Sequence, residues 1–281
     1  MNILLTNDDG VHAPGLQELR RALRRLGDVT VVAPEAQQSA VSSSLTLYVP
    51  LFLHSLPGHG IYAVGGTPAD AVKIAIREVM KTRPDLVVSG INAGLNTGSN
   101  LFYSGTVAGA LEGALWGIPS VAVSLQASDR FDFRSAAATT VRVIRKFRAD
   151  LEPGVVLNVN VPARPAAEIA GVRWTRPEPS PFVDRFTRRK DPRGRVYYWM
   201  RGNPDTPQSR RRAADRVWTD DEAIHAGYVS VTPLRRDLTD EGRLRAKAHL
   251  AVASLRGSPK SETLKSKRYA PTLGRSDART S

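Results

Sequence analysis

Short apolar runs alternate along the first two thirds of the chain with segments in which apolar residues recur every three or four positions. The runs predict strands at 3–6, 29–33, 45–49, 61–64, 86–89, 121–124 and 156–161. The segments between them predict helices at 14–26, 69–81, 104–116 and 133–151. Strands that alternate with helices in this way are typical of βαβ units. The pattern therefore predicts an α/β fold built on a mostly parallel sheet.

The pattern changes at about residue 172. Three prolines, a run of arginines and the cluster Tyr197-Tyr198-Trp199 predict an extended arm or hairpin at about 172–215. A last strand at 228–231 lies in a closing region at 216–240, which completes a folded domain at 1–240 with its core at about 1–171. The segment 241–281 is rich in Ser, Lys and Arg and cannot bury a core, so we expect a basic tail that is largely disordered.

The composition limits the kind of protein. Of the 281 residues, 41% are hydrophobic and 24% are charged, as in ordinary globular domains, and no apolar run approaches the roughly 18 residues that a membrane span needs. The chain enters its first strand directly from Met1, so we expect no signal peptide and a cytoplasmic location. There is no cysteine, which excludes disulfides, thiolate metal sites and cysteine nucleophiles. Any metal must be held by oxygen or histidine ligands.

The net charge of +13 is concentrated in the C-terminal third. Residues 241–281 hold ten Lys or Arg and three Asp or Glu, and residues 173–212 hold twelve and four. Solvated surface and a disordered tail are the commoner explanation for such stretches. A nucleic-acid-binding protein that uses the basic arm and tail without catalysis is the alternative function.

Adjacent carboxylates mark the end of the first predicted strand. Asp8 and Asp9 stand in the stretch Thr6-Asn7-Asp8-Asp9-Gly10, at the sheet edge where open α/β folds bind ligands. A divalent cation such as Mg²⁺ or Mn²⁺ would offset the repulsion between the two acids. An Asx-turn that ends at Gly10 explains the same residues without any ligand.

Two further oxygen-rich loops follow core strands. Ser39 lies in the loop after 29–33, and Asn92 lies in the glycine- and asparagine-rich stretch 90–100 after 86–89. Loops after parallel strands emerge at one edge, so both side chains could complete a metal shell around Asp8 and Asp9. A flexible serine linker and left-handed asparagine turns are the ordinary explanations. The glycines of the second loop lack the G-x-G-x-x-G spacing, which disfavours a dinucleotide-binding module.

The stretch Tyr103-Ser104-Gly105-Thr106 begins the predicted Gly/Ala-rich helix. Amide groups and hydroxyls at a helix N-terminus form a natural phosphate site, although a plain serine N-cap is the commoner explanation. Taken together, the motifs predict a metal cluster and an anion site at one sheet edge.

The motifs resemble those of the SurE family, the stationary-phase survival proteins that act as 5′/3′-nucleotidases. The resemblance covers Met1 to about Asp240. It rests on Asn2-Ile3-Leu4-Leu5-Thr6-Asn7-Asp8-Asp9-Gly10, Gly66-Thr67-Pro68-Ala69-Asp70, Val88-Ser89-Gly90-Ile91-Asn92, Tyr103-Ser104-Gly105-Thr106-Val107, Ala110-Leu111-Glu112-Gly113, Leu157-Asn158-Val159-Asn160-Val161-Pro162 and Gly227-Tyr228-Val229-Ser230-Val231-Thr232-Pro233. The basic tail and Gln37-Gln38 before Ser39 depart from the family pattern.

The resemblance implies a Rossmann-like core, an arm used to form dimers or tetramers, and one Mg²⁺ or Mn²⁺ ion per subunit. It implies metal ligands at Asp8, Asp9, Ser39 and Asn92, and phosphate-side residues at Asn96, Ser104, Gly105 and Thr106. The implied reaction is hydrolysis of nucleoside 5′- and 3′-monophosphates, and in some members of short polyphosphate.

Metal-assisted hydrolysis is the mechanism that these residues favour. Asp8 or Asp9 could also accept the proton of the attacking water, or both could serve only as ligands. A mechanism with Asp8 as the nucleophile is a rival, but phosphatases of that kind use an Asp-x-Asp spacing that Asp8-Asp9 does not match.

Overall fold

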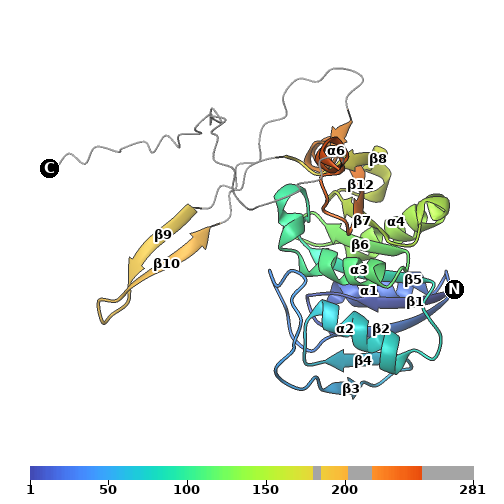
Figure 1. Cartoon of the computed structure of the whole chain (residues 1–281), viewed down its shortest axis with the longest axis horizontal. Coiled ribbons are helices and arrows are strands. Elements are labelled where there is room, and N and C mark those ends of the chain that lie inside the picture. Colours follow the sequence, from blue (N-terminus) through green and yellow to red (C-terminus); the bar gives the residue numbers. More distant parts are fainter. Residues whose placement is uncertain (180–184, 202–216, 249–281) are drawn as a thin grey trace, which may run out of the picture. The chain divides into compact units, whose positions relative to one another are not determined.

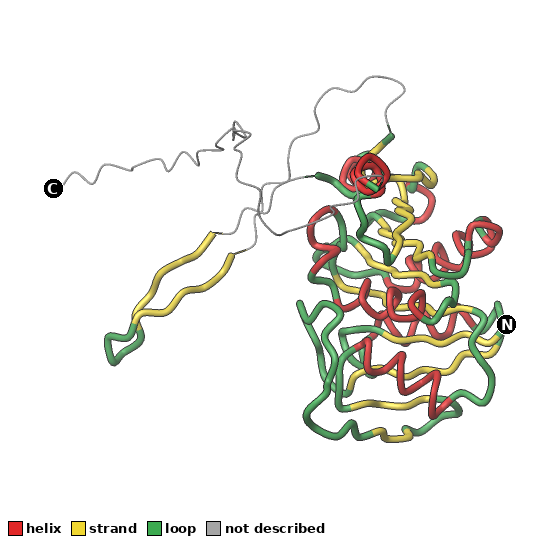
Figure 2. Tube along the Cα trace, viewed as in Figure 1, coloured by secondary structure: helices red, strands yellow, loops and turns green. Residues whose placement is uncertain are grey.

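The computed structural model describes residues 1–179, 185–201 and 217–248. Its contacts divide the chain into two units, Met1–Asp237 and Leu238–Ser281, and each is described by itself. The first unit is a twisted sheet with helices on both faces (Figures 1 and 2).

Ten strands form the main sheet, in the order β11-β8-β12-β7-β6-β5-β1-β2-β4-β3. Their bounds are β1 (Asn2–Thr6), β2 (Asp28–Pro34), β3 (Leu53–Ser55), β4 (Ile61–Val64), β5 (Leu86–Ala93), β6 (Ser120–Leu125), β7 (Val155–Val161), β8 (Gly171–Arg176), β11 (Trp218–Thr219) and β12 (Tyr228–Arg235). The six strands from β4 to β7 are parallel to one another, while β3 and β12 pair antiparallel with their neighbours β4 and β7. The carboxyl ends of these six strands therefore share one edge of the sheet.

Two pairs of helices cover the two faces. The helices of the first unit are α1 (Pro14–Leu23), α2 (Pro68–Ile74), the π-helix η1 (Ala75–Val79), the 3₁₀ helix η2 (Gly98–Phe102), α3 (Gly105–Leu115), α4 (Phe133–Lys146), the 3₁₀ turns η3 (Arg148–Asp150) and η4 (Ala166–Glu168), and α5 (Asp220–His225). Helices α1 and α4 pack together on one face, and α2 and α3 pack together on the other.

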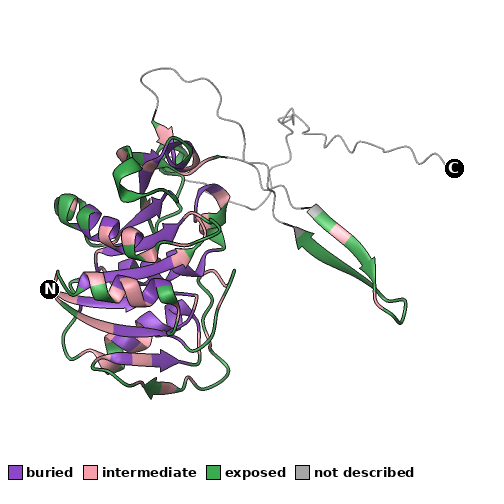
Figure 3. Cartoon of the chain, turned by 180° about the vertical axis from the view of Figure 1, so that it is seen from behind, coloured by how far each residue is buried: buried purple, intermediate pink, exposed green. Residues whose placement is uncertain are grey.

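The apolar core lies along the strands, which are buried through most of their length (Figure 3). On the α1/α4 face, alternate strand residues such as Leu5, Val88 and Val159 form one continuous cluster with Leu16 and Leu19 of α1. The opposite strand residues contact α2 and α3 in two smaller clusters. Glycines of α3 allow the second contact to be close, because a Cβ atom at Gly113 would lie 2.7 Å from Cβ of Val87 in β5.

The predicted α/β fold with a mostly parallel sheet is confirmed, but three local predictions are wrong. The predicted strand at 45–49 is an exposed loop, and the strand beside β4 is instead Leu53–Ser55, which finds a hydrogen-bonding partner there. The predicted loop from residue 90 begins later, because β5 continues through a bulge to Ala93. Gly171–Arg176, which we expected at the start of the arm, pairs with β12 and belongs to the main sheet.

A separate antiparallel hairpin lies in the rest of the predicted arm. It consists of β9 (Arg185–Lys190) and β10 (Val196–Arg201), and Phe186, Tyr198 and Trp199 are each at least 60% exposed. The expected use of the arm in oligomer formation stays a prediction.

The second unit contains helix α6 (Glu241–Lys247), in which no residue is buried. This helix lies in the segment for which we expected a largely disordered tail, and residues 249–281 lie outside the described part of the chain. Among the described residues, no helix is long and apolar enough to cross a membrane.

Candidate active site

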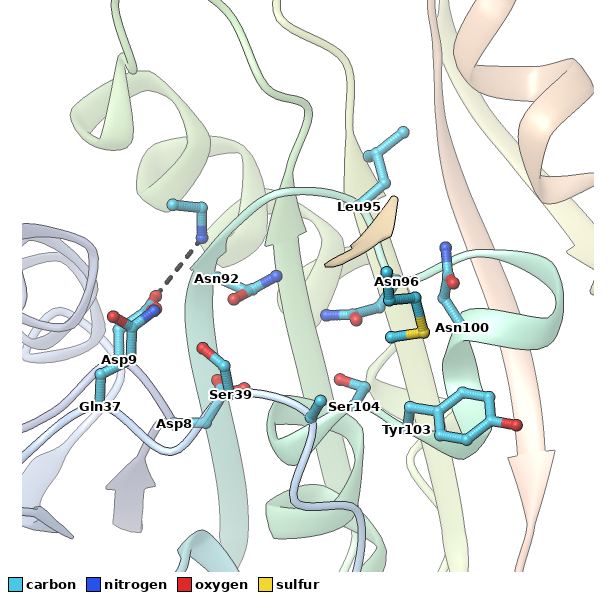
Figure 4. Close-up of a pocket in the computed structure, with 13 residues that line it drawn as sticks. Asp8, Asp9, Gln37, Ser39, Asn92, Leu95, Asn96, Asn100, Tyr103 and Ser104 are labelled. Carbon is cyan, nitrogen blue, oxygen red and sulfur yellow. Dashed lines mark hydrogen bonds between the residues drawn. The ribbon is translucent and has the colours of Figure 1, made fainter. Parts of the chain in front are cut away.

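A cavity of about 500 Å³ opens at the carboxyl edge of the parallel strands. Its walls bring together six of the residues predicted from the sequence, and Figure 4 shows their side chains around it. They are Asp8, Asp9, Ser39, Asn92, Asn96 and Ser104. Residues that lie up to 96 positions apart in the chain thus meet at one site.

The turn after β1 leaves both carboxylates available to the cavity. The side chain of Asn7 donates to the carbonyl oxygen of Gly10 at 2.9 Å, and Gly10 adopts a φ of 101°, a region that glycine tolerates. Asn7 thus holds the turn as a donor, and its Oδ1 has no hydrogen-bond partner among the described residues, so Asn7 does not form the expected Asx-turn. Neither aspartate is needed to close the turn, so its geometry does not explain why Asp8 and Asp9 are acids.

Asp8 is the more deeply buried acid, with 7% of its surface exposed. Burial raises the pKa of its carboxyl group to about 6, the hydrogen bond from the Thr106 side chain opposes this rise, and the charge of Asp9 adds to it. The Thr106 hydroxyl donates to Oδ1 of Asp8 at 2.5 Å. A cation beside this carboxylate would offset the unfavourable burial of its charge.

Asp9 is only partly buried and is held less tightly. Its Oδ2 accepts from the Ala93 amide at 3.4 Å, and its Oδ1 accepts from the Gln37 side chain at 3.5 Å. Burial raises the pKa of this carboxyl group as well, and the bond from Ala93 opposes the rise. The long contacts leave its oxygens available to a ligand in the cavity.

Two neutral oxygens come from the neighbouring loops. The loop that carries Ser39 is tied to the β1 turn by a bond from the Gln38 amide to the Asp8 carbonyl at 2.7 Å. The amide nitrogen of Asn92 donates to the Gly94 carbonyl at 2.8 Å, so its Oδ1 is the atom turned toward the aspartates (Figure 4). Both loops therefore present hydroxyl or carbonyl oxygen to the cavity.

Residues at the start of α3 contact Asp8 and also border the cavity. Ser104 caps the helix by accepting from the Val107 amide at 3.1 Å, and its side chain also borders the cavity. Thr106 is fully buried and points at Asp8. A Cβ atom at Gly105 would lie 2.7 Å from Cβ of Asp8, so glycine is required for this close approach. Thr106, predicted as a phosphate-side residue, thus contacts the Asp8 carboxylate, and neither Thr106 nor Gly105 is among the residues that border the cavity.

Sequence reasoning missed three residues that hold Asn96. Asn158 and Asn160 of β7 bond to its backbone, and Ser124 of β6 accepts from its side chain at 2.8 Å. The available signal was the alternation of Asn with Val and Leu in a strand covered by helices on both faces, where polar residues need partners.

Asp220 is a second anchor that the sequence analysis did not single out. Its fully buried carboxylate accepts from the amides of Gly98, Glu178 and Asp221, each at 2.9 Å. Burial raises the pKa of this group to about 6, and the bond from the Gly98 amide opposes the rise. The bond to Gly98 fixes the end of the loop that carries Asn96.

The donors around the cavity suit a hard divalent cation. Two carboxylates, one hydroxyl and one amide oxygen match the oxygen ligands that Mg²⁺ and Mn²⁺ prefer. Within the described ranges, no group of three or more His, Cys, Asp or Glu side chains could hold a metal. A cation at this site would therefore depend on the neutral oxygens of Ser39 and Asn92.

Comparisons with known proteins agree with this geometry. The family profile described as "Survival protein SurE" matches residues 3–182. The 5′-nucleotidase SurE of Syntrophobacter fumaroxidans is 48% identical over 243 residues, covering 85% of this chain and 95% of the relative. The 5′/3′-nucleotidase SurE of Salmonella paratyphi A is 46% identical, covering 85% and 92%. The crystal structure of the SurE protein from Aquifex aeolicus superposes with a TM-score of 0.77 at 38% identity, covering 88% and 99%.

Proposed function

Because the chain belongs to the SurE family, we propose that it hydrolyses nucleoside 5′- and 3′-monophosphates to nucleoside and phosphate with one divalent metal ion per subunit. Short polyphosphate is a further candidate substrate. The observation that carries the proposal is the gathering of four oxygen donors and Asn96 at one cavity. The names of the relatives favour this enzyme over the nucleic-acid-binding alternative.

Each side chain has a distinct role in this proposal. Asp8, Asp9, Ser39 and Asn92 hold the metal, and Thr106 orients Asp8 through its hydroxyl. Bound Mg²⁺ or Mn²⁺ would polarise a phosphoryl oxygen and lower the pKa of a coordinated water. Asn96 and Ser104 face the same cavity and contact the phosphoryl oxygens, where hydrogen-bond donors stabilise the charge of the transition state.

Asp9 is the acid that we assign to the proton of the attacking water. Asp8 is engaged by Thr106 at 2.5 Å, whereas both hydrogen bonds to Asp9 are 3.4 Å or longer.

The central test is phosphate release from AMP and GMP with added Mn²⁺. We expect activity that EDTA abolishes and Mn²⁺ restores, and a loss of at least about a hundredfold in kcat for Asp9→Asn, because metal catalysis contributes several kcal/mol. Asp150→Asn is a matched control, since Asp150 is an exposed acid just before β7, at the opposite edge of the sheet. Activity that survives both EDTA and Asp9→Asn would refute the proposal.

A second measurement separates hydrolysis from a covalent aspartyl-phosphate route. A beryllium fluoride adduct of the Asp8 carboxylate would support the covalent route, and its absence, together with metal-dependent turnover, would support direct attack by water. The bond between Asp8 and Thr106 favours direct attack, because it occupies an oxygen of the would-be nucleophile.

Self-association through the hairpin is part of the proposal. The exposed aromatic side chains of Phe186, Tyr198 and Trp199 are suited to burial against a second copy of the chain. Light scattering should give the mass of a dimer or tetramer. A shorter chain in which the 185–201 hairpin is replaced by a Gly/Ser linker should give a smaller assembly, and an unchanged mass would contradict this part.

A further inference from the structure

Asn96 is buried although it lies in a loop. It stands between β5 and η2, borders the cavity and keeps only 7% of its surface exposed. Loop backbone is normally satisfied by water, so a buried loop residue needs protein partners for its amide and carbonyl groups. The partners of Asn96 all come from two strands that supply none of the predicted metal ligands.

Four hydrogen bonds hold this one residue. Its backbone amide donates to Oδ1 of Asn160 at 2.9 Å. Its carbonyl oxygen accepts from Nδ2 of Asn158 at 2.9 Å and from Nδ2 of Asn160 at 3.2 Å. Its side-chain Nδ2 donates to Oγ of Ser124 at 2.8 Å. The backbone and the side chain of Asn96 are therefore fixed independently.

The strand register explains how the three anchors reach the same loop. Ser124 of β6 lies beside Asn160 of β7, and Asn158 precedes Asn160 by two residues, so all three occupy the same face of the sheet. Each anchor is fully buried. Buried amides and hydroxyls are unfavourable unless they are hydrogen-bonded. The Ser124 hydroxyl, Nδ2 of Asn158 and both polar atoms of Asn160 bond to Asn96, whereas Oδ1 of Asn158 has no partner among the described residues.

We propose that Ser124, Asn158 and Asn160 are positioning residues that hold Asn96 against the transferring phosphoryl group. This inference rests on the proposed function and adds three residues that touch neither metal nor substrate. Ser124 occupies one hydrogen of the Asn96 amide, which leaves the other hydrogen and Oδ1 for the cavity. Because the serine hydroxyl can donate or accept, it holds either orientation of the amide.

Ser124→Ala is the sharpest variant, because it removes the hold on the side chain and leaves the backbone bonds in place. Its matched control is Ser230→Ala. Ser230 lies beside Asn160 on the other side, is also fully buried, and its hydroxyl bonds to Thr175 at 2.8 Å. Both variants delete one buried hydroxyl from adjacent places in the same sheet, but only Ser124 contacts Asn96.

We expect Ser124→Ala to lower kcat for AMP about tenfold with little change in KM, because the lost orientation matters most in the transition state. Asn160→Ala removes two hydrogen bonds and should lower kcat further. The kcat of Ser230→Ala should stay within about twofold of that of the unchanged protein. The Mn²⁺ concentration for half-maximal activity should stay constant in all three variants, since the metal ligands are untouched.

Two outcomes would overturn the inference. One is equal kcat for Ser124→Ala and Ser230→Ala. The other is a rise in the half-maximal Mn²⁺ concentration that parallels the loss of kcat, which would indicate general damage to the site.

Hydrogen exchange tests the anchors without catalysis. In Asn160→Ala, the peptide that covers residues 94–104 should exchange faster than in Ser230→Ala, because the Asn96 amide has lost its acceptor. Equal exchange would refute the anchoring. If the unchanged protein releases no phosphate from any nucleotide, the proposed function fails, whereas the exchange result still decides whether the loop is held.

Discussion

The two faces of the central sheet differ most where the parallel strands approach the cavity. On the α1/α4 face, the last residues of β5, β6 and β7 are apolar and join one continuous core through Ile91, Leu125 and Val161. On the α2/α3 face, the same strand ends carry Ser89, Ser124, Asn158 and Asn160, all fully buried. The side chains on the two sides of these strand ends are equally buried, but they are apolar on one side and polar on the other.

This difference separates two tasks. Apolar contacts are non-directional and stabilise the fold in proportion to the area that they bury. Hydrogen bonds are directional, so the polar strand ends can fix the Asn96 loop, and Thr106 of α3 on the same side can fix the Asp8 carboxylate. Substitutions on the first face should therefore change stability, and substitutions near the polar ends of the second should change catalysis.

The largest change in stability should come from a substitution on the apolar α1/α4 face. Leu19→Ala removes a fully buried side chain from α1 and should lower the free energy of unfolding by about 2–5 kcal/mol. Because Leu19 is remote from the cavity, kcat should be unchanged at a temperature where the variant is folded. Urea unfolding and steady-state kinetics measure the two quantities. A large loss of kcat in the folded variant would break the distinction between the faces.

A pair of glycines tests the distinction within one helix. In Gly105→Ala the new methyl group would collide with Asp8, and in Gly113→Ala it would collide with Val87. We expect about a hundredfold loss of kcat for Gly105→Ala, comparable with the removal of one catalytic electrostatic contact. Gly113→Ala should lower the melting temperature and keep kcat in the folded fraction. Similar kcat values for the two variants would contradict the role assigned to the start of α3.

The buried charge of Asp220 predicts a pH-dependent stability on the site side of the sheet. Its pKa is raised from 3.8 to about 6 by burial, so the folded chain holds this proton more tightly than the unfolded chain. That contribution to stability is fully present below pH 3.8 and is lost as the pH rises through about 6. The free energy of unfolding of Asp220→Asn, relative to that of the unchanged protein, should therefore rise by at most about 3 kcal/mol between pH 4 and pH 7.

Urea unfolding of both proteins at several pH values measures this gain, because contributions of other groups cancel in the difference. The replacement also leaves an NH₂ group facing a backbone amide, which adds a loss that does not depend on pH. A difference that stays constant from pH 4 to pH 7 would contradict the prediction.

The smallest effect should come from the outer surface of α1. Glu18 and Arg21 form an exposed ion pair at 2.7 Å. Glu18→Gln should change the free energy of unfolding by less than about 0.5 kcal/mol, because water and salt screen such pairs. Unfolding at low and high salt measures it, and kcat should not change. A larger change in the free energy of unfolding would mean that the exposed side of α1, and not only its buried side, contributes substantially to stability.

The sequence predicted the fold and the residues of the site well, but it did not predict which residues hold them in place. The sequence pattern predicted β4 at its observed bounds and α3 to within one residue at each end. The predicted strand at 45–49 is wrong because its alternation of residue types resembles that of a strand. In the structure Tyr48 is 98% exposed, and Leu53–Ser55 pairs with β4 instead. A local pattern carries no information about which segment the sheet edge will accept.

The contacts of the site depend on residues that are distant in the chain. Asp8 and Asp9 stand out by their adjacency, but the bond from Thr106 to Asp8 spans 98 residues and the bond from the Gly98 amide to Asp220 spans 122. Asn158 and Asn160 matched the pattern of a strand, and only the register beside β6 turns them toward Asn96. Such partners follow from the assembled sheet, since no local spacing encodes them.

The anchoring of the Asn96 loop from later parts of the chain has a consequence for the order of folding during synthesis. All four predicted metal ligands have been made once residue 92 leaves the ribosome, but the loop anchors follow at residues 124, 158, 160 and 220. Because domains generally fold as units, we expect the site to be assembled only after these anchors have been synthesised. A nascent chain of 96 to 219 residues therefore carries every proposed ligand and Asn96 itself, but lacks at least one anchor of the loop that holds Asn96.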